Sequence, residues 1–73
     1  MKLNSKTKNN LRIGDGLKIN NEVMMIVSLW HCGNSTYITL ADSYHRNIYG
    51  SPVSLFYGAE MFKNIEKPYR INE

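Results

Sequence analysis

The sequence contains only one cysteine, Cys32, so no disulfide within the chain can stabilise the fold. It also lacks a long apolar run, since the longest, Val23–Val27, is far below the length that spans a membrane. The polar residues 1–10 lack the apolar core of a signal peptide. These absences predict a cytoplasmic protein, in which the Asn34-Ser35-Thr36 glycosylation triplet reads as a turn.

The chain is also short. Its 73 residues allow one domain, and a domain of this size buries only about 60% of the surface that its unfolded chain exposes. The core must be thin. We therefore expect a partner surface, either a protein or a second copy of the chain, to cover some of the apolar residues.

Acidic residues are missing from the first ten positions, which hold Lys2, Lys6 and Lys8 and so account for the whole net charge of +3. From Leu11 to Glu73, six basic and six acidic residues balance. Nucleic-acid-binding domains usually carry clustered excess Lys and Arg. The neutral body therefore favours a protein partner over DNA or RNA.

The same segment lacks core-forming residues, since only Leu3 could be buried. We predict that residues 1–10 form a basic flexible tail that adds little stability, and that residues 11–73 form a single small β domain.

Alternating apolar residues predict the strands. Leu17–Ile19 leads into Asn20-Asn21, whose residues tolerate the left-handed backbone of a two-residue hairpin loop, and Glu22–Trp30 forms the return strand. This strand is apolar on both faces and is therefore predicted to be central. The remaining predictions are a strand at 36–41, a loop at 42–47, a turn at 50–52, a strand at 53–57 and a short strand at 69–71. Residues 58–65 form either a short helical turn, which we favour, or an irregular strand.

About five short strands in so small a chain predict an SH3-like barrel or a strongly bent antiparallel sheet, because closure removes exposed edges. The run from Gly14-Asp15 through the Asn20-Asn21 hairpin to Val27 resembles the opening of SH3-like and KOW-type barrels. That resemblance implies binding of peptides, proteins or nucleic acids.

Catalytic and metal-binding groups are scarce. The potential zinc ligands are His31, Cys32 and His45, with Asp42 as an added carboxylate. Their spacing is more typical of residues in turns than of a zinc site. Cysteine catalysis would need a base held against Cys32 and a third group that orients the base. The sequence therefore predicts no enzyme, no metal site and no cofactor.

The most distinctive segment is Asp42–Tyr49, in which Tyr44, His45, Arg46 and Tyr49 form the predicted binding site. Aromatic and Arg side chains supply much of the binding energy at protein interfaces. The alternative is a solvated loop with its Tyr rings folded over the barrel.

The abundant Asn, Ile and Lys resemble the composition of small bacteriophage or mobile-element accessory proteins, which often block host proteins. We expect a non-catalytic module that acts by protein contact. In the alternative, a nucleic-acid binder, Lys2, Lys6 and Lys8 contact phosphates while Tyr37, or other exposed aromatics such as Trp30, stack on bases.

Overall fold

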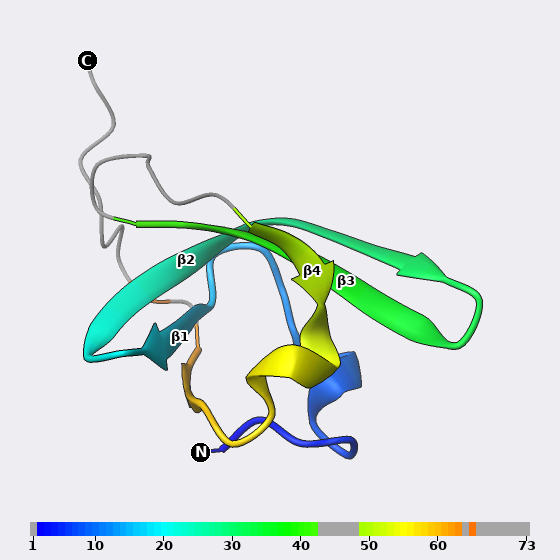
Figure 1. The fold of residues 1–73 in the computed structure, drawn as a ribbon, viewed down its shortest axis with the longest axis horizontal. Helices are drawn as coiled ribbons and strands as arrows, with labels where there is room; N and C mark the ends of the chain where they lie inside the picture. Colours follow the sequence, from blue (N-terminus) through cyan, green and yellow to red (C-terminus); the bar gives the residue numbers. More distant parts are fainter. Residues whose placement is uncertain (1, 43–48, 64, 66–73) are drawn as a thin grey trace.

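The computed structural model describes residues 2–42, 49–63 and 65, which form one antiparallel five-stranded sheet (Figure 1). The strand order is β4-β3-β2-β1-β5, so the chain is mostly β as predicted. The strands are β1 (Gly16–Ile19), β2 (Glu22–Cys32), β3 (Ser35–Ala41), β4 (Tyr49–Pro52) and β5 (Glu60–Phe62). Two short 3-10 helices accompany them, η1 (Lys8–Asn10) and η2 (Val53–Phe56).

Strand β2 is the central strand, and it pairs with different neighbours along its length. Its first residues pair with β1, while the rest pair with β3, and Met25 lies opposite both Gly16 and Ala41. The register then shifts between Ile26 and Ser28, leaving one extra residue in β2, as in a β-bulge. Such a bulge bends the strand and increases its twist. The sheet is therefore bent and open, with β4 and β5 at its edges.

The hairpin between β1 and β2 has the predicted loop. Asn20 and Asn21 both adopt positive φ, 53° and 66°, and Ile19 lies opposite Glu22. A two-residue loop of this kind requires left-handed backbone at both positions, which Asn accepts more readily than most residues. The local sequence is therefore sufficient to specify this turn.

The core lies on one face of the sheet and contains residues from every strand except β4. Alternation along β3 places Ile38 and Leu40 inward, opposite Leu29 and Ile26 of β2. The buried hydrophobic cluster consists of Leu3, Leu11, Leu17, Met24, Ile26, Ile38, Leu40, Val53 and Met61.

The N-terminal segment corrects the prediction of a loose tail. Leu3 is 0% exposed, and its backbone exchanges hydrogen bonds with the 58–59 turn: Leu3 N–H donates to the Ala59 carbonyl and Gly58 N–H donates to the Leu3 carbonyl. Lys2 also forms an isolated β-bridge with Glu60. The segment supplies a core residue that the thin sheet needs, so residues 2–10 are part of the packed domain.

Three other predictions between residues 50 and 65 are wrong. The expected turn at 50–52 belongs to β4, and the expected strand at 53–57 is mainly the 3-10 helix η2. The favoured helical turn within 58–65 is replaced by the strand alternative, because this segment contains β5. The reason is topological, because the chain must leave β4 at one edge of the sheet and reach β5 at the other. Only Val53 of η2 is buried, while Leu55 is 70% exposed. The predicted loop at 43–47 and strand at 69–71 lie outside the described residues.

Within the described part of the chain, no helix is long and apolar enough to cross a membrane.

Candidate functional site

The most prominent exposed feature is a pair of stacked aromatic rings. Trp30 of β2 lies directly opposite Tyr37 of β3, and the ring centroids are 5.8 Å apart with an interplanar angle of 12°. Trp30 remains 41% exposed, and Tyr37 is half-buried. Two large rings are thus held together on a surface instead of being folded into the core.

The pair is part of an uncharged surface that extends over three strands, here called the Trp30 face. Pro52 of β4 lies opposite Tyr37, and Gly50 lies opposite Thr39. A Cβ atom at position 50 would lie 3.7 Å from Trp30 Cη2, an ordinary van der Waals distance, so the edge of the indole ring reaches the β4 backbone at Gly50. Register and alternation place the following residues on this face: Ser28, Trp30, Cys32, Ser35, Tyr37, Thr39, Gly50 and Pro52.

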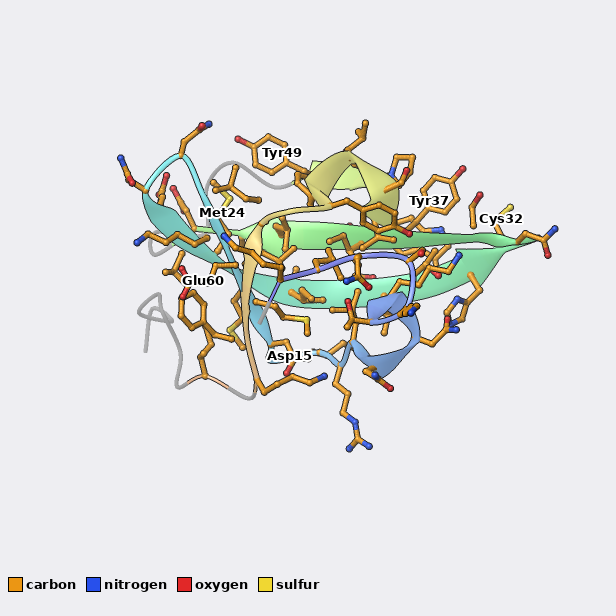
Figure 2. All side chains as sticks on the ribbon, turned by 90° about the horizontal axis from the view of Figure 1, so that it is seen from below. Asp15, Met24, Cys32, Tyr37, Tyr49 and Glu60 are labelled. Atoms are coloured by element: carbon orange, nitrogen blue, oxygen red, sulfur yellow. The ribbon has the colours of Figure 1, made fainter. Side chains whose placement is uncertain are left out.

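The other half of the same sheet surface is partly covered, although Lys18 of β1 is exposed there. Its row across four strands consists of Phe62, Gly16, Met25 and Ala41, and Ile65 packs over Gly16. Gly16 and Ala41 are buried there. The exposure of Trp30 is therefore a property of the hairpin end of the sheet. Figure 2 shows Tyr37 and Cys32 toward that end, with Met24 and Glu60 toward the other.

The structure describes only one of the four predicted binding residues, Tyr49. Tyr44, His45 and Arg46 lie outside the described residues, so their role stays a prediction. Tyr49 is 40% exposed, but it lies opposite Leu40 and so has the opposite alternation from Gly50. It is three positions from Pro52, about 10 Å along the strand.

The residues of the nucleic-acid alternative are dispersed. The backbone of Lys2 forms a β-bridge with Glu60 of β5. Lys6 is exposed in the turn that precedes η1. Only Lys8 lies close to the Trp30 face, because it lines a small hollow of about 70 Å³ together with Pro52 and Tyr57. Tyr37 and Trp30, which that alternative uses to stack on bases, both lie on the face, where their rings stack on one another.

The histidine and cysteine that the sequence placed in a turn lie at the end of β2. His31 Nδ1 is 3.1 Å from Thr36 Oγ1, and Cys32, an exposed free thiol, points to the other side of the strand. The structure thus does not pair the imidazole with the thiol. Among the described residues, no three His, Cys, Asp or Glu side chains gather closely enough to hold a metal ion.

The sequence contained a signal for the aromatic pair that the sequence prediction did not use. With Gly33-Asn34 as a two-residue loop, counting outward places residue 32 opposite 35, 31 opposite 36 and 30 opposite 37. A large aromatic side chain such as that of Trp30 is usually buried. The hairpin instead carries it beyond the edge of the core.

Comparison with protein-family models, with curated proteins and with solved structures found no match for this chain. Functional inference therefore starts from the geometry of its own surface.

Proposed function

We propose that the protein is a non-catalytic binding module that recognises another protein through the Trp30 face. The stacked Trp30 and Tyr37 rings carry this proposal. Exposed Trp and Tyr side chains supply large contact areas with few rotatable bonds, and such residues dominate the binding energy of protein interfaces. Pre-stacking reduces the conformational entropy that binding would otherwise cost.

The chemistry of the face indicates the kind of partner. Its described residues include no Lys, Arg, Asp or Glu side chain. A phosphate backbone would find no cation among them, whereas a partner surface of apolar and hydrogen-bonding groups would be complementary. We therefore infer a protein partner with an uncharged, apolar contact patch.

The strand arrangement supports the resemblance to SH3-like proteins, since β1 lies between β2 and β5, and a 3-10 helix connects β4 with β5. The sheet is open, with β4 and β5 unpaired to one another in that order. A cytoplasmic location and a bacteriophage-type role, in which the module occupies a surface of a host protein, are the parts of this proposal that come from composition alone.

The test uses the single tryptophan as both contact and probe. Tagged wild-type protein and its variants would capture partners from the native host, with and without nuclease. Purified partners would then be titrated by calorimetry, or by Trp fluorescence for the variants that keep Trp30. Trp30→Ala and Tyr37→Ala should each weaken binding by about 1–3 kcal/mol. Ile13→Ala is the matched control, since Ile13 is 61% exposed and lies outside the face.

Two further sets of variants separate the alternatives. If Tyr44, Arg46 and Tyr49 form the interface instead, their Ala variants will lose affinity while Trp30→Ala keeps it. If the ligand is nucleic acid, capture will be nuclease-sensitive, and replacing Lys2, Lys6 and Lys8 will abolish most of it with a steep dependence on salt. Either result would overturn the assignment to the Trp30 face.

A further inference from the structure

A second surface, separate from the Trp30 face, has the chemistry of an anion site. It is a hollow of about 400 Å³ at the other side of the N-terminal segment. The described residues that line it are Asn9, Asn10, Arg12 and Lys63. All four carry nitrogen hydrogen-bond donors, and two carry positive charge.

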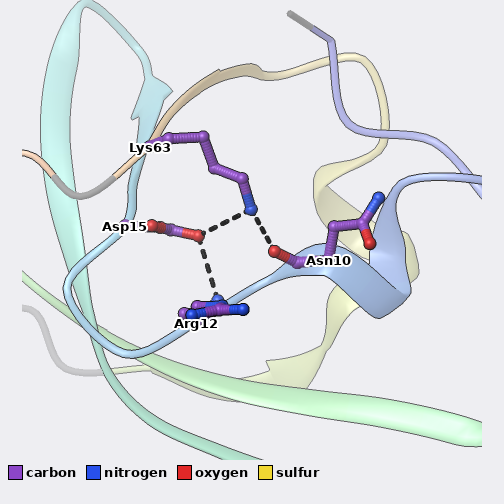
Figure 3. A network of polar contacts seen from close by, with 4 residues as sticks. All are labelled: Asn10, Arg12, Asp15 and Lys63. Carbon is purple, nitrogen blue, oxygen red and sulfur yellow. Dashed lines mark hydrogen bonds and ion pairs between the residues drawn. The ribbon is translucent and has the colours of Figure 1, made fainter.

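The backbone around this hollow is held by Asp15, whose side chain is 0% exposed (Figure 3). The Arg12 N–H donates to Asp15 Oδ2 at 3.0 Å, and the Asp15 N–H donates to the Arg12 carbonyl at 3.1 Å. The same turn is tied to β2, since Ile26 N–H donates to the Asp15 carbonyl and Gly14 N–H to the Ile26 carbonyl. The Cα of Arg12 is therefore fixed before any ligand arrives.

Lys63 is anchored at the same place but keeps donor capacity. Its ammonium donates to Asp15 Oδ2 at 3.2 Å and to the Asn10 carbonyl. An ammonium has three donors, so one is left for a ligand. The buried Asp15 charge is matched by Lys63, and the side chain of Lys63 is still 38% exposed.

Arg12 provides the unbalanced charge. Its side chain is exposed and lines the hollow, and among the described residues its guanidinium has no hydrogen-bond or ion-pair partner. A guanidinium binds two oxygens of a phosphate at once through its planar fork, and neighbouring amide and ammonium groups add further donors.

We propose that this hollow binds the phosphate group of a small phosphorylated molecule, with Arg12 as the main anion ligand and Asn9, Asn10 and Lys63 as additional donors. The hollow lies within the volume range of small-molecule sites, about 300–1,000 Å³. Its lining is polar and gives few apolar contacts, so the phosphate supplies most of the recognition. The proposal is independent of the partner suggested for the Trp30 face.

The experiment is an NMR titration of the full chain at constant ionic strength, with inorganic phosphate, adenosine monophosphate and adenosine as probes. We expect phosphate and the monophosphate to give saturable shifts of the Asn9 and Asn10 side-chain amides and of Arg12 Nε, and adenosine to give none. Arg12→Gln should weaken binding at least tenfold, and Arg12→Lys should weaken it less. The matched control is Lys18→Gln, which removes an exposed charge on β1 and should change affinity less than twofold.

Unchanged backbone shifts remote from position 12 would establish that Arg12→Gln is folded, since only its backbone takes part in the Asp15 network. Linear, unsaturable shifts, or an equal loss in Lys18→Gln, would overturn the proposal in favour of general electrostatic attraction. Binding of a single-stranded oligonucleotide more than tenfold tighter than the monophosphate, and dependent on Arg12, would overturn the assignment to a small molecule.

Discussion

Ile65 packs directly over Gly16, so that its Cδ1 atom occupies the space in which a Cβ atom of residue 16 would stand. Gly16 lies in β1 between Met25 and Phe62, on the sheet face opposite the core. A residue that follows β5 thus covers the back of β1. This contact explains why one half of that face is partly covered, whereas the half around Trp30 is open.

Gly16→Ala should displace Ile65 and lower the free energy of unfolding by about 1–2 kcal/mol, because the added methyl overpacks the site. Urea denaturation measures the loss, and the Ile65 methyl resonance reports the movement. In an Ile65→Ala background the loss should be smaller, since only the 3.2 Å approach to Val23 Cγ1 then opposes the added methyl. Equal losses in both backgrounds would refute the contact.

Leu3→Ala should lower the free energy of unfolding by about 2–4 kcal/mol, because it removes a fully buried core side chain. Thermal and urea unfolding give the value. Ile13→Ala serves as the control, since Ile13 is 61% exposed and should cost less than about 0.5 kcal/mol. A loss below about 1 kcal/mol for Leu3→Ala would restore the loose tail that the sequence predicts.

Lys63→Met should destabilise the fold by about 1–3 kcal/mol, because it removes an ion-pair partner of the buried Asp15 carboxylate. The Lys63 side chain is itself 38% exposed, so solvent screening keeps the effect below that of a fully buried pair. Combining Lys63→Met with Asp15→Asn should recover part of the loss. Strict additivity of the two changes would show that the ion pair carries no coupling energy.

Asn21→Val should destabilise the β1–β2 hairpin by about 1–2 kcal/mol, because a β-branched residue is strained at the positive φ of this position. Asn21→Gly should be neutral or slightly stabilising, since Gly accepts positive φ freely. Denaturation curves of the two variants decide the point. Val and Gly of equal stability would mean that the loop is not of the two-residue left-handed type.

Features that depend only on neighbouring residues could be predicted from the sequence. Alternation of apolar residues predicted β2 as a central strand and also predicted β3. The backbone preference of Asn20-Asn21 was enough to predict the turn between β1 and β2. The Trp30 face was harder to predict. Tyr37 was named for the nucleic-acid alternative, but its stacking on Trp30 depends on cross-strand register. The Arg12 hollow could not be predicted, because it joins residues about fifty positions apart.

Which residues complete the core and which remain exposed depends instead on contacts between distant segments of the fold. Leu3 looks like an isolated apolar residue in a polar segment, yet a thin sheet needs a cover, and hydrogen bonds to the 58–59 turn hold Leu3 there. Leu55 alternates as a strand residue would, yet the chain must cross from β4 to β5, so it turns outward in η2. Burial depends on which distant segments meet, and local periodicity does not contain that information.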